Sequence, residues 1–164
     1  MADDALAATV LATRAPIILA PAMDANMYQN AATQDNVETL AARGLVIAGP
    51  AEGRLASGLV GLGRLLESRE LLGYVRMVLG RTGDLADRTI VVSAGGTREP
   101  VDPVRVISNR SSGKMGYAVA EAARDRGART VLVAAPTALP DPVGVLVTHT
   151  ETALEMREAI LDAS

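Results

Sequence analysis

Two polar segments in the C-terminal half contain the residue types that bind phosphate. The first, residues 93–105 (SAGGTREPVDPVR), follows an apolar run, and its glycines let backbone N–H groups approach an anion closely. The second, residues 107–116 (ISNRSSGKMG), precedes a segment with helical periodicity. We expect Ser111 and Ser112 to cap that helix and Lys114 to add positive charge at its N-terminus. Together these segments predict a site for a phosphate-bearing ligand.

Each segment also has a simpler interpretation. A pair of glycines is compatible with an ordinary tight turn, and serines and cations before a helix are compatible with a plain capped helix. Two such loops at one sheet edge favour a nucleotide site, because open α/β sheets bind ligands beyond the carboxyl ends of their strands. The glycine-rich segment, residues 93–105, lacks a GxGxxG fingerprint, so a generic dinucleotide-binding fragment is a weaker alternative.

The periodicity around these segments predicts an α/β fold with parallel sheets. Short apolar or β-branched runs alternate with amphipathic segments, which is the βαβ pattern of a sheet covered by helices. Strands are expected at residues 15–21, 45–48, 89–94, 130–134 and 145–148. Helices are expected at residues 5–13, 33–42, 67–79, 113–126 and 150–163.

Two stretches lack periodicity and are predicted to be long loops. Residues 49–63 contain five glycines, and residues 95–110 contain two prolines. In the helix expected after the second loop, helical spacing predicts one apolar face, formed by Met115, Val119, Ala122 and Ala123.

The composition excludes several classes of function. A net charge of −3, a pI near 5.2 and the absence of a basic stripe argue against nucleic-acid binding. The lack of cysteine excludes disulfides and thiolate metal sites, and His149 alone cannot form a histidine cluster. No apolar run reaches the roughly 18–20 residues that span a bilayer, and the N-terminus is acidic. We therefore expect a cytoplasmic protein with no membrane partner.

The string GGTREPVDPVRVISNRSSGKMG, residues 95–116, closely resembles the opening signature of phosphopantothenate–cysteine ligases. Those enzymes activate the carboxylate of 4′-phosphopantothenate with CTP and Mg²⁺, and cysteine then displaces CMP. The resemblance implies that Arg105 and Asn109 contact the acyl-cytidylate intermediate. It also implies a set of nucleotide-binding residues, namely Gly95, Gly96, Thr97, Ser111, Ser112, Gly113 and Lys114.

The N-terminal half resembles a second family. Residues 21–28 (PAMDANMY) are similar to the Pro-x-Met-Asn-x-x-Met-Trp motif of the FMN-dependent phosphopantothenoylcysteine decarboxylases, and residues 31–37 and 49–58 continue the resemblance. It implies that Asp24 and Ser57 occupy catalytic positions and that residues 53–63 form a flap over the substrate. The substrate-binding residues that it implies are Pro21, Ala22, Met23, Asn26, Met27 and Gly58.

Two residues depart from the decarboxylase pattern. Asp24 stands where the family has an asparagine that binds the substrate carboxylate, and Ser57 stands where it has a proton-donating cysteine. Two facing carboxylates repel each other unless one is protonated, and a serine is a poorer proton donor than a thiol. Either altered residues carry the chemistry, with Asn26 as a possible substitute for the amide, or this half is a non-catalytic oligomerising or regulatory module.

The two resemblances imply two partial Rossmann-like units joined near residues 82–87. Residues 1–82 correspond to the C-terminal half of the flavodoxin-like decarboxylase domain, and residues 83–164 to the N-terminal part of the ligase domain. We expect a chain truncated at both ends, with partial sites and marginal stability on its own. The families also imply small-molecule substrates and a homo-oligomer.

Overall fold

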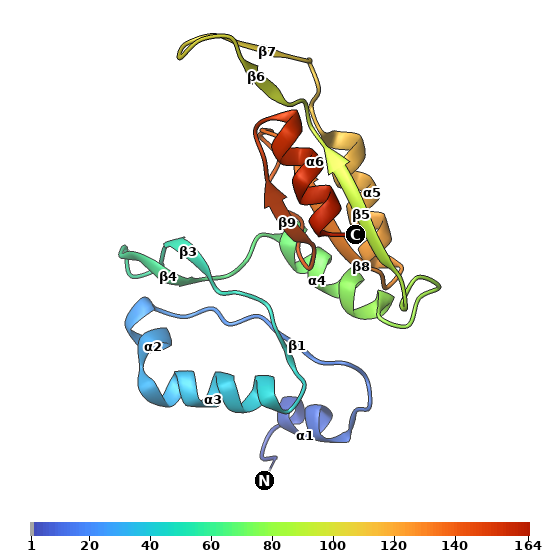
Figure 1. Ribbon diagram of the computed structural model, residues 1–164. Coiled ribbons are helices and arrows are strands. Elements are labelled where there is room, and N and C mark those ends of the chain that lie inside the picture. The colour runs from blue at the N-terminus through green and yellow to red at the C-terminus, as the bar shows by residue number, and fades with distance from the viewer. Residues whose placement is uncertain (1) are drawn as a thin grey trace. The chain divides into compact units, whose positions relative to one another are not determined.

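The computed structural model describes residues 2–164, which divide into two compact units (Figure 1). One unit ends at Leu72 and the other comprises Gly73–Ser164. The division falls within helix α4 (Ser68–Gly80), so the two ends of this helix belong to different units.

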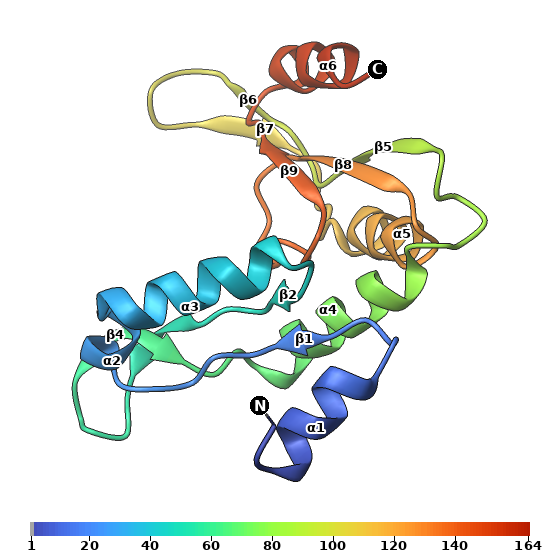
Figure 2. The ribbon, with the colours of Figure 1, turned by 90° about the horizontal axis from the view of Figure 1, so that it is seen from below.

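The first unit is built from short helices and strands. Their bounds are α1 Ala5–Ala12, β1 Ile18–Leu19, α2 Ala25–Gln29, α3 Ala31–Ala42, β2 Val46–Ile47, β3 Ala51–Arg54 and β4 Val60–Arg64. β1 and β2 pair in parallel, and α3, which lies between them in the chain, packs against β2 (Figure 2). The predicted βαβ order is confirmed. β1 is shorter than expected because Pro16 and Pro21 supply no N–H donors to the ladder.

The loop predicted for residues 49–63 is wrong, because these residues form the antiparallel hairpin β3–β4. Arg54 pairs with Val60, and the Leu55 N–H donates to the Leu59 carbonyl at 2.8 Å to close the turn. A Cβ on Gly63 would lie 2.2 Å from the Met23 carbonyl oxygen. The glycines therefore permit close packing against the segment before α2, and they also conceal the alternation that would have predicted a strand.

The second unit contains a three-stranded parallel sheet. Its elements are β5 Thr89–Ala94, β6 Arg98–Pro100, β7 Val106–Ser108, α5 Lys114–Asp125, β8 Arg129–Ala134, β9 Leu146–His149 and α6 Ala153–Asp162. The strand order is β5-β8-β9, with all neighbours parallel. α5 and α6 lie on opposite faces of the sheet (Figures 1 and 2). The predicted α/β fold with parallel strands is confirmed.

The core of the second unit lies between α5 and the sheet. It consists of Ala94, Tyr117, Ala120, Leu132 and Ala134, all nearly inaccessible to solvent. The predicted apolar face of α5 is wrong: Met115 is 83% exposed and Val119 is about half exposed, and Ala122 is exposed, so only Ala123 of the predicted face is buried. The buried positions of α5 are instead Tyr117, Ala120, Ala123 and Arg124, so the face that packs on the sheet is rotated relative to the predicted one.

The long loop predicted for residues 95–110 contains a second hairpin, formed by β6 and β7. Arg98 pairs with Ser108 in antiparallel register. The base of this hairpin is attached to the segment before α6: the Arg98 N–H donates to the Glu151 carbonyl at 2.7 Å, and the Glu99 carboxylate accepts from the Ala153 N–H at 2.9 Å. Pro100 obscured β6, since proline is uncommon inside a sheet, and β7 is only three residues long.

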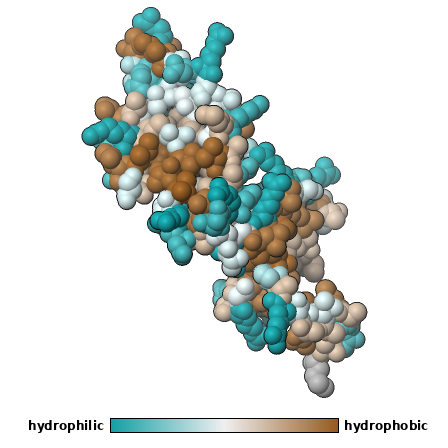
Figure 3. Space-filling view, turned by 90° about the vertical axis from the view of Figure 1, so that its right-hand side faces the viewer, coloured by the Kyte–Doolittle hydropathy of each residue, from teal (hydrophilic) through white to brown (hydrophobic). Residues whose placement is uncertain are grey.

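Apolar side chains remain on the surface of the molecule, where they form patches between polar groups (Figure 3). Leu6, Leu11 and Leu79 are 74–75% exposed, and α1 has no buried residue. Within residues 2–164, no helix has both the length and the apolar character needed to cross a membrane.

Candidate functional sites

The carboxyl ends of the three parallel strands lie level with one another. Ala94 of β5 pairs with Ala134 of β8, which in turn pairs with His149 of β9. A cavity of about 230 Å³ opens at the end of β5, where the segment after β5 meets the segment before α5. It is lined by Ser93, Ala94, Gly95, Ser111, Ser112, Gly113, Lys114, Met115, Gly116 and Met156. Five of the seven predicted nucleotide-binding residues are thus brought together.

Two glycines allow this close arrangement. A Cβ on Gly116 would lie 2.6 Å from the Ala94 Cβ and 2.7 Å from the Ser93 carbonyl oxygen, so α5 rests directly on β5. A Cβ on Gly96 would lie 2.8 Å from the Asn109 carbonyl oxygen, so the two predicted phosphate-binding segments touch here. Larger side chains at either position would separate the walls of the cavity.

The prediction that Ser111 and Ser112 cap α5 is wrong. The N-cap residue is Gly113, which adopts a left-handed conformation (φ 72°) and provides no side-chain cap. Ser111 Oγ accepts from the Gly113 N–H at 3.4 Å, but Gly113 itself lies one residue before the helix begins. The first N–H groups of α5 therefore lack a side-chain acceptor, and an anion can take that place because these donors and the helix dipole favour negative charge.

A second cavity, of about 460 Å³, borders the same loop. Ser111, Ser112 and Lys114 line both cavities, and the second one adds Arg98 and residues 136–139. Two cationic side chains, Arg98 and Lys114, thus face one space near the N-terminus of α5. The sequence predicted Lys114 but not Arg98, which depends on the unpredicted hairpin β6–β7.

Four predicted residues, Gly96, Thr97, Arg105 and Asn109, line neither cavity. Arg105 lies after the tip of the β6–β7 hairpin, where its Nε donates to an Asp102 carboxylate oxygen at 2.6 Å. The Val104 N–H and the Arg105 side chain both donate to Asp102 and hold the pKa of its carboxyl below the usual value. Asn109 contributes its backbone to the contact with Gly96, and Thr97 lies in the link to β6.

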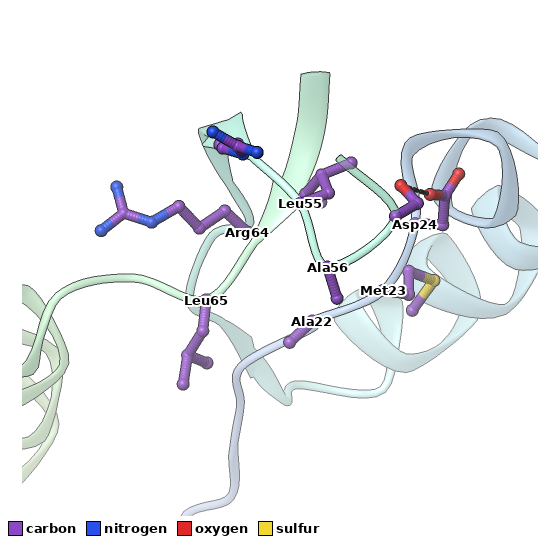
Figure 4. Close-up of a pocket in the computed structure, with 10 residues that line it drawn as sticks. Ala22, Met23, Asp24, Leu55, Ala56, Arg64 and Leu65 are labelled. Carbon is purple, nitrogen blue, oxygen red and sulfur yellow. Dashed lines mark hydrogen bonds between the residues drawn. The ribbon is translucent and has the colours of Figure 1, made fainter. Parts of the chain in front are cut away.

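The first unit contains a separate cavity of about 390 Å³ between the segment before α2 and the β3–β4 hairpin (Figure 4). It is lined by Ala22, Met23, Asp24, Arg54, Leu55, Ala56, Ser57, Gly63, Arg64 and Leu65. The structure therefore places Asp24 and Ser57, the two residues that depart from the family pattern, in one cavity.

Asp24 and Ser57 are joined by a hydrogen bond. The Ser57 hydroxyl donates to Asp24 Oδ2 at 2.5 Å (Figure 4). The Asn26 N–H donates to Asp24 Oδ1 at 3.1 Å. The Ser57 hydrogen bond, followed by the Asn26 one, holds the pKa of the Asp24 carboxyl below its ordinary value. The side chain is therefore ionised at neutral pH, and the neutral carboxylic acid that would relieve carboxylate–carboxylate repulsion is not favoured.

Four other predicted residues surround this cavity without lining it. Asn26 contributes only its backbone N–H to Asp24, so its side chain does not replace the family's amide. Met27 is 59% exposed, and Gly58, at φ 86°, forms the turn of the hairpin. Pro21 precedes the lining residues.

Two arginines in this cavity were not predicted. Arg54 has no hydrogen-bonding or ionic partner within residues 2–164, whereas Arg64 pairs with Glu67. Their position depends on the register of the β3–β4 hairpin. The sequence contained one signal for them, since each arginine directly follows a glycine of this hairpin, Gly53 or Gly63.

Within the part of the chain that the structure describes, metal-binding side chains do not gather in either unit. Among residues 2–164, no group of three or more His, Cys, Asp or Glu side chains is placed to hold a metal ion.

The two halves of the chain match two protein families. Residues 1–80 match the family described as Flavoprotein, and residues 85–164 match the DNA/pantothenate metabolism flavoprotein C-terminal domain.

Several curated relatives carry the name coenzyme A biosynthesis bifunctional protein CoaBC. The protein of Mycobacterium tuberculosis (strain H37Rv) is 50% identical over 164 residues, which cover 97% of this chain and 39% of that protein. That of Escherichia coli (strain K12) is 48% identical over 160 residues, covering 98% and 39%, and that of Vibrio vulnificus (strain YJ016) is 47% identical over 161 residues, covering 98% and 40%. The chain thus spans 39–40% of the length of these relatives.

A solved structure of the C-terminal domain of a coenzyme A biosynthesis bifunctional protein CoaBC is 49% identical to this chain. The match covers 48% of this chain and 40% of the chain in that structure, with a TM-score of 0.47.

Proposed function

We propose that the chain takes part in coenzyme A biosynthesis, because residues 1–80 match the Flavoprotein family and residues 85–164 match the DNA/pantothenate metabolism flavoprotein C-terminal domain family. The reactions proposed are the CTP-dependent ligation of 4′-phosphopantothenate with cysteine and the FMN-dependent decarboxylation of 4′-phosphopantothenoylcysteine. Because the chain spans 39–40% of its relatives, we propose that it holds part of each site.

The cavity at the N-terminus of α5 is the observation that carries the ligase proposal. Several hydrogen-bond donors lie around this cavity. They are the uncapped N–H groups of α5, the hydroxyls of Ser111 and Ser112, and the ammonium group of Lys114. These donors suit the phosphates of CTP, and donors fixed in place before the reaction stabilise charge that develops during acyl transfer. Arg98, in the adjoining cavity, is a further cation for the same phosphates.

Ligation would proceed in two steps. The substrate carboxylate attacks the α-phosphate of CTP and releases pyrophosphate, and the cysteine amine then attacks the acyl carbon and releases CMP. The donors around α5 would bind the phosphates during the first step. We propose that Arg105 and Asn109 contact the acyl-cytidylate. Mg²⁺ would arrive with the triphosphate, which is its usual mode of binding, since the described residues form no acidic cluster of their own.

The cavity of the first unit supports the decarboxylase proposal. Its volume of about 390 Å³ lies within the usual range for small-molecule sites, roughly 300–1,000 Å³. Apolar side chains such as Ala22, Met23 and Leu65 fit the ring of a flavin, and Arg54 fits an anionic group, so these are the residues that would hold FMN or substrate. The flavin would supply the oxidation that makes decarboxylation feasible. This chain supplies the hydrogen-bonded Asp24–Ser57 pair.

The alternative proposal is that the first unit is a non-catalytic oligomerisation or regulatory module. The ionised Asp24 favours it, because a carboxylate there would repel the carboxylate of the substrate. FMN absorbance and decarboxylation measured on the purified chain, with Asp24→Asn and Ser57→Cys reversions, discriminate the two. A gain in rate on reversion supports an active site altered by these residues. The cytoplasmic location and the homo-oligomer stay predictions.

Calorimetry tests the ligase proposal. CTP and Mg²⁺ are titrated into the chain and into Asn109→Ala and Ser111→Ala/Ser112→Ala variants. Hydrogen bonds to charged groups contribute about 1.5–3 kcal/mol each, so each variant should bind at least about tenfold more weakly. Ser164→Ala is a matched control, because the Ser164 hydroxyl donates only to the Ile160 carbonyl. Equal CTP affinity in all four proteins would refute the proposal.

A further inference from the structure

At one end of the first-unit cavity, the side chains of Asp24 and Ser57 have no free hydrogen-bond donor. An ionised carboxylate cannot donate, and its two oxygens have about four lone-pair sites, of which Asn26 and Ser57 fill one each. The Ser57 hydroxyl has a single proton, and the bond to Asp24 uses it. What Asp24 and Ser57 can still present to a ligand is therefore lone pairs.

The arginines supply the opposite chemistry in the same cavity. A guanidinium group has five N–H donors and no acceptor, and Arg54 uses none of them on another residue of the described chain. Arg64, which is paired with Glu67, lies away from Asp24 in the close-up (Figure 4). Neither arginine forms an ion pair with Asp24, so the cavity keeps separate cationic and anionic groups.

From this distribution we infer that the cavity binds a ligand with an anionic group for Arg54 and an uncharged or cationic hydrogen-bond donor for Asp24 and Ser57, and that it discriminates against a carboxylate at the Asp24 end. The inference deepens the proposed function, on which it rests. Of the two compounds related by decarboxylation, 4′-phosphopantetheine has a phosphate together with amide and thiol donors. 4′-Phosphopantothenoylcysteine adds a carboxylate. The cavity therefore favours the decarboxylated compound.

An amide at position 24 would reverse this discrimination. The NH₂ group of asparagine donates hydrogen bonds that a ligand carboxylate accepts, and the side chain has no charge to repel it. Asparagine also remains an effective N-cap for α2, so Asp24→Asn preserves the local fold.

Calorimetric titration of each compound into the full chain and its Asp24→Asn variant tests the inference. The wild-type chain should bind 4′-phosphopantetheine at least about fivefold more tightly than the carboxylated compound, which is the effect of two like charges about 4 Å apart in water. In Asp24→Asn the ratio should fall to one or invert. Arg54→Gln is the matched control: it should weaken both compounds by a similar factor and leave the ratio unchanged.

Three outcomes would overturn the inference. These are wild-type binding of the carboxylated compound with equal or greater affinity, a ratio that Asp24→Asn leaves unchanged, and failure of both proteins to bind either compound. In each case, FMN absorbance of the same samples shows whether the flavoprotein function proposed for the first unit itself stands.

Discussion

Replacing Gly116 with alanine should destabilise the second unit, although alanine is the better helix former. Gly116 lies inside α5, where alanine is favoured over glycine by about 0.8–1.0 kcal/mol. The added methyl group would lie 2.6 Å from the Ala94 Cβ and 2.7 Å from the Ser93 carbonyl oxygen. One of these neighbours is backbone within the sheet and cannot rotate away.

The steric effect should exceed the gain in helix propensity. Overpacking a close-packed core costs about 1–3 kcal/mol, and two contacts this short place Gly116→Ala near the upper limit. Subtracting about 1 kcal/mol for propensity leaves a net loss of about 2 kcal/mol. Gly73→Ala in α4 is the matched control, because its methyl group would meet side chains and no backbone: the Val143 Cβ at 3.2 Å and the Arg124 Nη1 at 3.7 Å. It should leave stability unchanged or raise it by up to about 1 kcal/mol.

Urea denaturation and hydrogen exchange measure this difference. With an m-value of about 1–3 kcal/mol/M, Gly116→Ala should lower the urea midpoint of the second unit by about 1 M. Exchange should accelerate in α5 and β5. CTP affinity should fall as well, because α5 carries the N–H groups proposed to bind phosphate. A Gly116→Ala protein as stable as Gly73→Ala would refute the packing argument.

Three further predictions concern capping and titration. Ser57→Ala should raise the pKa of Asp24 toward its ordinary value, because the Ser57 hydrogen bond is the main cause of its lowering; carboxyl ¹³C shifts followed against pH measure this, and an unchanged pKa would contradict the assigned bond. Thr152→Ala should destabilise α6 by about 1 kcal/mol, since Thr152 and Glu155 form a capping box; exchange rates equal to wild type would contradict it. The N–H groups of Glu151 and Thr152 donate to the Glu155 carboxylate and lower its pKa. Its stabilisation of α6 is therefore complete above the ordinary pKa of about 4.3 and should disappear as the pH falls through the lower pKa of the folded state. Hydrogen-exchange protection of α6 that does not depend on pH in that window would refute this.

The parallel sheet of the second unit could be predicted because its signals are local. Runs of β-branched residues separated by helical periodicity identified β5, β8 and α5 to within one residue at most ends. Their order in the chain then required a parallel sheet, with ligands at the carboxyl ends of its strands.

The two hairpins could not be predicted, because glycine and proline obscured their alternation. Gly61 and Gly63 in β4 stand where apolar side chains would have shown a period of two. Their role is to let the hairpin approach the segment before α2, which is a tertiary requirement. Arg54 and Arg98 were missed for the same reason, since each faces a cavity only because a hairpin places it there.

The capping of α5 depended on backbone conformation rather than on residue type. Ser111 and Ser112 are good N-cap residues, but Gly113 adopts the left-handed conformation that starts the helix after them. The serine side chains are therefore left beside the cavity instead of inside the cap.

Amide chemical shifts of the ¹⁵N-labelled chain during titration with CTP and Mg²⁺ test the central claim most directly. The account predicts that the largest perturbations occur at Gly95 and at residues 111–116, where α5 begins, with smaller ones at Arg98. Saturating CTP that leaves these amides unshifted, or that perturbs only residues of the first unit, would contradict it.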